Sequence, residues 1–406
     1  MTVDQLTHNK VCKARELLYG VARHTPLDYS TTFSEMTGHE VYLKLENMQK
    51  TGSFKIRGAY NKVMNLSDRQ RSRGVIAASA GNHAQGVAYA ASLAGARCTV
   101  VMPSAAPLSK FMATQSYGAE VILAGSGYDE AYQLACALQR ENGATFIHSF
   151  DDLDVIAGQG TIALELLDDL PDVDAVLVPV GGGGLLAGIS FVLKKIKPAV
   201  RVIGVQAEGA PAMFLSYQKG CLHEIKGTGT FADGIAVSKP GEITFTLLSN
   251  YVDDIVTVDD EETAGAILML LERAKIVVEG AGAVGLAALI YNKISLKNSK
   301  VAVVLSGGNI DANTLSIIIE RGLVKSGRYI RLRIIVIDRP GSLSKLISAV
   351  AQAGANVISV SHDRIKQSVP LKQVEVLLSL ETRNKEHVEQ IITNLCRTGY
   401  FPEITS

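Results

Sequence analysis

The chain has 406 residues, of which 47% are hydrophobic and 6% aromatic, and this length and composition predict two or three domains and exclude a disordered protein. Its 40 basic and 40 acidic side chains cancel to a formal net charge of zero, and the sequence contains no block of lysine and arginine. Because no positive field is available to neutralise phosphates, we expect no nucleic-acid partner.

The first motif with chemical meaning is the segment 46–63, in which Ser53, Phe54 and Lys55 stand between two glycines just before a predicted helix. A lysine buried beside an aromatic ring loses solvation of its ammonium form, so its pKa falls and the free amine becomes a nucleophile and a base. A solvated surface lysine is the alternative, because most of the 40 basic residues must be solvated. Lys55 is therefore a candidate catalytic residue.

Residues 70–310 alternate short β-branched runs with helical patterns, which is typical of βαβ units around a parallel sheet. Glycines at several strand ends mark turns into helices. We therefore predict an α/β fold with parallel-rich twisted sheets. The predicted strands cover 74–79, 97–103, 119–125, 175–180, 201–208 and 300–308, and the predicted helices include 83–95, 128–142 and 261–275.

A turn of small residues, 78–88, follows the first of these strands and opens a helix. The N–H groups at a helix N-terminus attract a carboxylate, and small side chains leave room for one. The candidate contacts are the amide of Asn82 and the backbone of Ser79, Ala80, Gly81 and His83. An ordinary strand-to-helix turn, in which His83 only caps or packs, is the alternative.

Four consecutive glycines follow the strand at 175–180. Without Cβ atoms, the N–H groups of Gly181, Gly182, Gly183, Gly184 and Leu185 can surround a phosphate at the start of the next helix. No Lys-Ser or Lys-Thr pair follows, so the segment is not a Walker loop. A dinucleotide site is the alternative, because Glu208 ends the next strand, although the GxGxxG pattern is absent.

The segment 305–310 again follows a strand and contains Ser306, whose neutral hydroxyl can pair with a ring nitrogen. Pyridoxal phosphate requires an amine that can form a Schiff base, an aromatic neighbour, a phosphate cradle and a partner for its ring nitrogen. The motifs described above offer all four. A nicotinamide dinucleotide would account for the glycine loop and Glu208 but not for Lys55 and Ser306. The motifs together favour pyridoxal phosphate as the cofactor.

After Gly327 the pattern changes. The segment 329–404 has the order strand, helix, strand, strand, helix and short strand, with an antiparallel pair flanking 367–371. This βαββαβ order is ferredoxin-like, and about 75 residues are enough for a small domain. We place the boundary between the two parts near 322–328.

These motifs resemble those of the pyridoxal-phosphate threonine dehydratases, also called threonine ammonia-lyases, which have the tryptophan-synthase-β fold (fold type II). The resemblance covers about residues 10–325 and includes HTPL at 24–27 and FADGIAV at 231–237. It implies a catalytic domain over 1–325, with a smaller subdomain at about 45–150. The tail at 329–406 resembles a regulatory ACT domain, whose Arg-Pro-Gly turn corresponds to 339–341.

The resemblance also implies a role for each motif. Lys55 would carry the cofactor and then remove the Cα proton of the substrate, and Phe54 would pack beside the cofactor ring. Asn82 would hold the phenolic oxygen of the cofactor, and Ser306 would meet the pyridine nitrogen. The phosphate would lie on Gly181, Gly182, Gly183, Gly184 and Leu185, and the substrate carboxylate on Ser79, Ala80, Gly81, Asn82 and His83.

The implied reaction is β-elimination of L-threonine to 2-oxobutanoate and ammonia. A hydroxyl at Ser306 cannot hold a full proton on the ring nitrogen, which favours loss of a β-hydroxyl over transamination. Serine racemases of this fold type have a serine acid where this chain has Ala80, so a dehydratase is favoured over a racemase. A dehydratase of L-serine or another β-hydroxy amino acid and a non-catalytic amino-acid sensor are the alternatives.

The sequence also gives expectations for metal binding, effectors and assembly. The serine racemases bind a cation at positions that here are Glu208, Ala212 and Phe214; one carboxylate is missing, so no metal is predicted. ACT domains generally bind amino acids, and isoleucine would fit a biosynthetic enzyme, whereas another amino acid or a nucleotide would fit a degradative one. A plain dimerisation module is the alternative. We expect a homodimer or homotetramer.

We expect neither a targeting signal nor paired cysteines. Residues 1–18 lack the apolar run of a secretory signal, and no apolar stretch of about 18 residues occurs, so we expect a cytoplasmic protein without a membrane partner. The five cysteines stand singly, with no CxxC pair. This spacing indicates reduced thiols rather than a disulfide framework or a zinc site.

Overall fold

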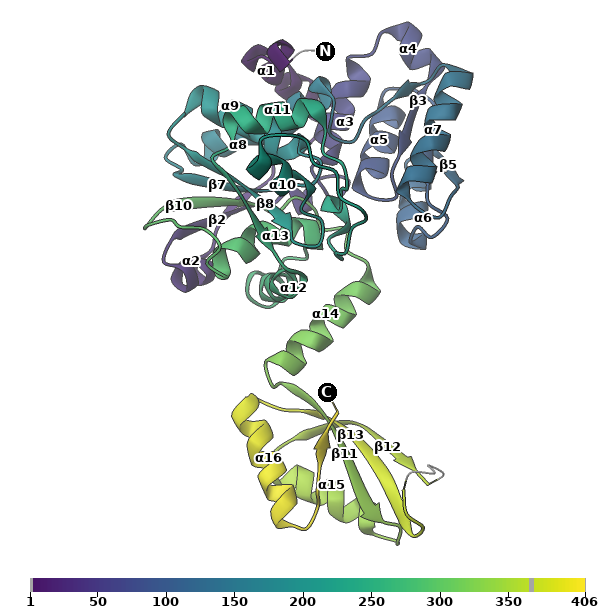
Figure 1. Cartoon of the computed structure of the whole chain (residues 1–406), viewed down its shortest axis with the longest axis vertical. Coiled ribbons are helices and arrows are strands. Elements are labelled where there is room, and N and C mark those ends of the chain that lie inside the picture. The colour runs from purple at the N-terminus through teal and green to yellow at the C-terminus, as the bar shows by residue number, and fades with distance from the viewer. Residues whose placement is uncertain (1–2, 365–368, 406) are drawn as a thin grey trace. The chain divides into compact units, whose positions relative to one another are not determined.

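The structure is a computed structural model that describes residues 3–364 and 369–405 (Figure 1). The chain divides into two compact units, Met1–Asp311 and Ala312–Ser406. Part of the predicted turn at 367–371 lies outside the described residues. Among the residues that are described, no helix combines the length and the apolar character needed to cross a bilayer.

The larger sheet of the first unit has six strands in the order β1-β2-β10-β7-β8-β9, and all neighbours except β1 and β2 run parallel. Its central strand β7 is buried at every residue, as expected for a parallel strand covered on both faces. The strands are β1 (Leu27–Tyr29), β2 (Glu40–Lys44), β7 (Ala175–Pro179), β8 (Arg201–Ala207), β9 (Asp254–Val258) and β10 (Lys300–Val304).

Helices pack on this sheet, with α9 and α13 contacting its central strands and α8 and α11 contacting α9. The helices of this part are α1 (His8–Leu18), α2 (Thr31–Thr37), α8 (Leu153–Asp169), α9 (Gly184–Ile196), α10 (Ala212–Lys219), α11 (Glu242–Tyr251), α12 (Asp260–Met269) and α13 (Gly280–Ile290). The helix predicted at 261–275 is α-helical only as far as Met269. A π-helical turn, Leu270–Ala274, follows it and is capped by Lys275, which has a φ of 62°.

A second sheet in the same unit has four parallel strands in the order β5-β4-β3-β6. Its strands are β3 (Val75–Ala78), β4 (Cys98–Met102), β5 (Glu120–Leu123) and β6 (Thr145–Phe146); its helices are α3 (Lys55–Met64), α4 (Asp68–Arg73), α5 (Asn82–Leu93), α6 (Leu108–Ser116) and α7 (Tyr128–Asn142). Helix α3 packs against both α5 and α8, and so links the two sheets (Figure 1). The predicted α/β fold with parallel-rich sheets is confirmed.

The second unit contains an antiparallel sheet in the order β12-β13-β11-β14. Alternate residues of β11 are buried, because one face of the sheet packs on two helices that contribute Leu346, Val350, Ile391 and Leu395. The elements are α14 (Ala312–Lys325), β11 (Tyr329–Ile337), α15 (Ser342–Gln352), β12 (Asn356–Asp363), β13 (Gln373–Glu381), α16 (Lys385–Arg397) and β14 (Glu403–Ile404). The predicted βαββαβ order is confirmed.

Candidate active site

The segments that carry Lys55 and Ser306 lie side by side. Ser53 and Gly307 form an isolated antiparallel bridge. The N–H of Phe54 donates to the carbonyl of Ser306 at 3.1 Å, and the N–H of Gly308 donates to the carbonyl of Gly52 at 2.9 Å. Two motifs that are about 250 residues apart in the sequence therefore form one wall of a site.

Lys55 is the first residue of α3, and its side chain is half-buried. Nζ donates to the carbonyl of Ser149 at 3.0 Å and lies 5.2 Å from the centre of the Phe54 ring. Burial lowers the pKa of Lys55 from 10.5 to about 8, an effect that the charge of Glu279 partly opposes. The amine therefore loses its proton far more readily than that of a surface lysine.

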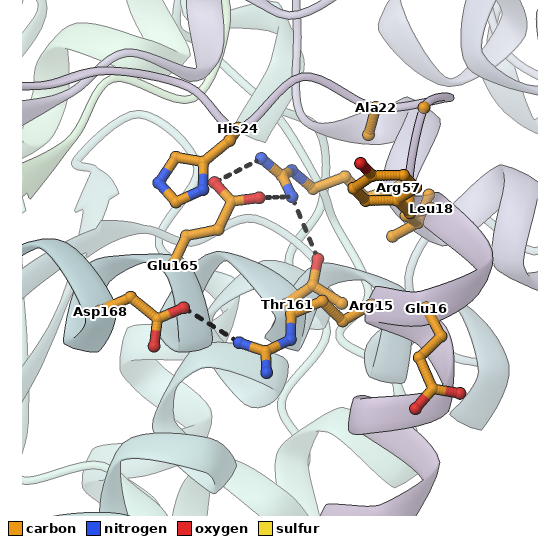
Figure 2. Close-up of a pocket in the computed structure, with 11 residues that line it drawn as sticks. Arg15, Glu16, Leu18, Ala22, His24, Arg57, Thr161, Glu165 and Asp168 are labelled. Carbon is orange, nitrogen blue, oxygen red and sulfur yellow. Dashed lines mark hydrogen bonds and ion pairs between the residues drawn. The ribbon is translucent and has the colours of Figure 1, made fainter.

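The start of α3 is anchored by Arg57, which has an exposed fraction of 1%. Its guanidinium pairs with Glu46 at 2.7 Å and with Glu165 at 2.6 Å, and it donates to Thr161 at 3.2 Å. Figure 2 shows Arg57 at the wall of a pocket of about 590 Å³ beside α1 and α8. Arg57 is already paired and the pocket holds none of the predicted site residues, so this pocket is not the candidate active site.

Asn82 begins α5, and its side-chain amide is held on both sides. Nδ2 donates to Oε1 of Glu279 at 2.6 Å, and Oδ1 accepts from Nδ2 of Asn309 at 2.7 Å. Nδ2 of Asn309 also donates to the carbonyl of Thr51 at 2.8 Å. These bonds fix the amide of Asn82 in one orientation, with one Nδ2 hydrogen left for a ligand.

Glu279 is a site residue that the sequence reasoning missed. It is buried, and its pKa is raised from 4.5 to about 7, mainly by burial and then by the charge of Asp233. The charges of Lys110 and Lys55 lower this pKa, and so does the hydrogen bond that Asn82 donates. The available signal was an acidic residue directly before a helix of glycine and alanine, at 279–283.

In the turn before α5, some backbone N–H groups are already hydrogen-bonded within the protein and others are not. The N–H of Ser79 donates to the carbonyl of Val101 at 3.1 Å, and the N–H of Gly81 donates to the hydroxyl of Ser79 at 3.2 Å. Asn82 and His83 are the first two residues of α5, where N–H groups have no partner within the helix. The backbone of these two residues is therefore the part of the turn best suited to an anion, with Ala80 beside it.

The side chain of His83 is buried and bonded within the protein. Nε2 lies 2.8 Å from the carbonyl of Ile147, to which it can only donate. Burial, followed by the charge of Lys55, lowers the pKa of His83 to about 3. A neutral imidazole with its proton on Nε2 matches the alternative in which the His83 side chain packs within the protein.

The glycine loop joins β7 to α9. Gly183 has a φ of 99°, which favours glycine, and a Cβ on Gly181 or Gly184 would lie 2.8 Å from Ile235 or 2.9 Å from Phe150. A Cβ on Gly182 would overlap the Phe150 ring. The glycines of the loop therefore lie where any side chain would collide with neighbouring residues, and Leu185 continues the loop into the first turn of α9.

Two hydroxyls near Lys55 also fit a polar ligand. Among the described residues, Oγ1 of Thr51 and Oγ of Ser53 are buried side-chain atoms without a hydrogen-bond partner, and Ser306 beside them has an exposed fraction of 2%. A buried hydroxyl without a partner is costly, so its presence needs an explanation. A polar group bound against this wall would supply one.

This fold and these residues define a class of α/β enzymes with two parallel-rich sheets, a lysine whose pKa is lowered and a glycine loop between a strand and a helix. The family described as "Pyridoxal-phosphate dependent enzyme" matches residues 19–307, and an ACT domain matches 326–399. The chain therefore belongs to the pyridoxal-phosphate dependent enzymes, with a C-terminal ACT domain, and pyridoxal phosphate is its cofactor.

Known proteins resemble the chain over most of its length. An L-threonine ammonia-lyase of Thermotoga maritima is 54% identical over 395 residues, which are 97% of this chain and 98% of that relative. A processed threonine deaminase isoform from Solanum lycopersicum matches with a TM-score of 0.74 and 38% identity, covering 78% of this chain and 88% of that one. Maize serine racemase matches with a TM-score of 0.74 and 35% identity, covering 78% of this chain and 98% of that one.

Proposed function

We propose that the chain is an L-threonine ammonia-lyase, which converts L-threonine to 2-oxobutanoate and ammonia by β-elimination. The observation that carries the proposal is the amine of Lys55, with its pKa lowered to about 8, in the same wall as Ser306. The relative from Thermotoga maritima, which is 54% identical over nearly the whole chain, supports threonine as the substrate.

The residues present fit pyridoxal phosphate. Glycines 181–184 stand where a Cβ would collide with neighbouring residues such as Phe150, and Thr51 and Ser53 offer unpaired buried hydroxyls. When bound, this cofactor withdraws electrons from the Cα atom of an amino-acid substrate. We assign the phosphate to the loop, the phenolic oxygen to Asn82 and the ring nitrogen to Ser306.

Lys55 is assigned two tasks, to bind the cofactor covalently and to remove the Cα proton. A lowered pKa serves both, because attack and proton removal need the free amine. Phe54 is assigned to pack beside the cofactor ring, and the centre of its own ring lies 5.2 Å from Nζ of Lys55. The backbone at 79–83 is assigned the substrate carboxylate, through N–H groups that begin α5.

Ala80 favours elimination over racemisation. A racemase needs an acid on the face of the substrate opposite Lys55, and an alanine side chain has no proton to give. Ala80 therefore distinguishes this chain from the serine racemases, whose fold it shares. The neutral His83, already bonded to Ile147, does not replace that acid.

The domain plan, assembly and location belong to the same proposal. We assign catalysis to residues 1–325, with a smaller subdomain at about 45–150, and regulation by an amino-acid effector to residues 329–406. A cytoplasmic homodimer or homotetramer is the expected form. The ACT domain at 326–399 supports amino-acid binding in the tail.

The proposal is tested by following the release of 2-oxobutanoate from L-threonine by the purified chain loaded with pyridoxal phosphate. Wild type should release the keto acid and ammonia in equal amounts, and Lys55→Ala should abolish release. Faster turnover of L-serine than of L-threonine would overturn the choice of substrate. Binding of the cofactor without ammonia release from any hydroxy amino acid would support a sensor instead.

A further inference from the structure

The turn at residues 148–151, between β6 and α8, contacts two parts of the site. Ser149 accepts from Nζ of Lys55 through its carbonyl at 3.0 Å. Phe150 lies against the glycine loop, where a Cβ on Gly182 would overlap its ring. Two neighbouring residues thus contact the lysine amine and the loop assigned to the phosphate.

The next residue of the turn, Asp151, holds the N-terminus of α11. Its carboxylate accepts from the N–H groups of Glu242 at 3.1 Å and Thr244 at 3.0 Å. The hydroxyl of Thr244 in turn donates to the carbonyl of Gly182 at 2.6 Å. The turn therefore supports the glycine loop from two sides, directly through Phe150 and indirectly through α11.

His148 closes this turn with its own side chain. Nδ1 accepts from the N–H of Asp151 at 2.8 Å and from the N–H of Phe150 at 3.3 Å. The imidazole also meets the Phe150 ring edge-on, with the ring centres 4.6 Å apart. Because Nδ1 accepts from two donors, the ring is neutral with its proton on Nε2.

We propose that His148 is a positioning residue, which sets the separation between the amine of Lys55 and the glycine loop by folding the turn at 148–151. The proposal rests on the proposed function, because it treats Lys55 and the loop as the two attachment points of one cofactor. His148 touches neither point and acts through Ser149 and Phe150. A protein binds a rigid cofactor tightly at two points when the distance between those points is already fixed before the cofactor binds.

An asparagine offers a conservative replacement that separates positioning from simple packing. A side-chain oxygen can accept from the N–H groups two and three residues ahead, and Asp152 in this chain does so with Asp154 at 2.8 Å and Val155 at 3.2 Å. His148→Asn should therefore keep the turn, whereas His148→Ala removes its acceptor. Ser67→Ala is a matched control, because it removes a similar bond, to Gln70, in the capping box of α4.

The experiment measures the rate at which the full-length holoenzyme of each variant releases pyridoxal phosphate, together with its absorption spectrum and thermal stability. His148→Ala should release the cofactor roughly tenfold faster than wild type, the change expected when about one net hydrogen bond is lost. His148→Asn should release it within about threefold of wild type, on the same scale. Ser67→Ala should match wild type in release rate.

Two results would overturn the proposal. One is cofactor release from His148→Ala at the wild-type rate. The other is equal acceleration in His148→Asn and His148→Ala with an equal fall in thermal stability, since this would indicate a packing role. A wild-type chain that binds no pyridoxal phosphate would overturn the proposed function itself. The absorption spectrum of the wild-type protein shows this before any variant is made.

Discussion

Glu279 sets the electrostatics of the candidate site at the scale of single residues. It is a buried carboxyl that accepts from Asn82 at 2.6 Å, and the charges of Asp233 and Lys110 act on it in opposite directions. Its pKa of about 7 means that it changes charge close to neutral pH. The amide assigned to the phenolic oxygen of the cofactor therefore has a partner whose charge depends on pH.

The raised pKa of Glu279 predicts a pH dependence of stability. Between pH 4.5 and about 7 the unfolded chain has lost this proton while the folded chain keeps it, so the contribution of Glu279 to stability falls as pH rises through this window. Glu279→Gln should remove that fall. The measurement is the free energy of unfolding of the cofactor-free protein, wild type against variant, at several pH values.

The other titrating groups contribute equally to the free energy of unfolding of both proteins, so their contributions cancel in the difference at each pH. His83 is buried and His148 is half-buried, and desolvation lowers both pKa values. Their contributions to the free energy of unfolding therefore fall as pH falls, which is the opposite direction to that of Glu279. A difference between wild type and Glu279→Gln that stays constant from pH 4.5 to 7 would contradict the assignment of a raised pKa to Glu279.

The glycine loop is the element whose geometry can be tested most directly. Gly182→Ala places a methyl group into the Phe150 ring, so the loop or the ring must move. We expect binding of pyridoxal phosphate to weaken by more than about tenfold, since several backbone N–H groups lose their alignment together. Equilibrium titration of the cofactor-free protein, followed by absorbance, measures the change.

Gly127→Ala is the matched control for the loop. Gly127 precedes α7, has an extended backbone and has no heavy atom within 4 Å of the position of a Cβ. This variant should bind the cofactor as wild type does. If both variants bound pyridoxal phosphate equally weakly, the close packing of Gly182 against Phe150 would not be what cofactor binding depends on.

The start of α3 provides a second test at the scale of elements. Arg57→Met leaves the carboxylates of Glu46 and Glu165 buried without their guanidinium partner, so we expect a loss of about 3 to 5 kcal/mol in the free energy of unfolding. Arg15→Ala breaks the exposed pair with Asp168 drawn in Figure 2 and should cost less than about 1 kcal/mol. Urea unfolding measures both, and similar losses would contradict the anchoring role of Arg57.

The elements were more predictable from sequence than their contacts. The strands predicted at 175–180 and 201–208 are observed as β7 and β8 with ends within one residue, because buried parallel strands are continuous apolar runs. The partners of Lys55 and Asn82 could not be predicted in the same way. Ser149 lies 94 residues from Lys55 and Glu279 lies 197 residues from Asn82, and only the packing of two sheets brings each pair together.

At the scale of the whole molecule, each compact unit has a hydrophobic core of its own. The first contains the clusters around the two parallel sheets, and the second contains the cluster of its antiparallel sheet and two helices. A unit with its own core can fold without the other. The motifs assigned to catalysis all lie in the first unit.

Removal of the tail should therefore separate catalysis from regulation. A chain truncated after Gly327 should keep its basal turnover of L-threonine and lose any response to amino acids that the full chain shows. Initial rates across a panel of amino acids, measured on both chains, test this. Equal responses from the two chains would place regulation outside the ACT domain.

The most direct measurement is chemical mapping of the amine that binds the cofactor. Borohydride reduction of the loaded protein, followed by proteolysis and mass spectrometry, should place a single pyridoxyl label on the peptide that contains Lys55, where burial lowers the amine pKa to about 8. A label on any other lysine, or none on this peptide, would contradict the account.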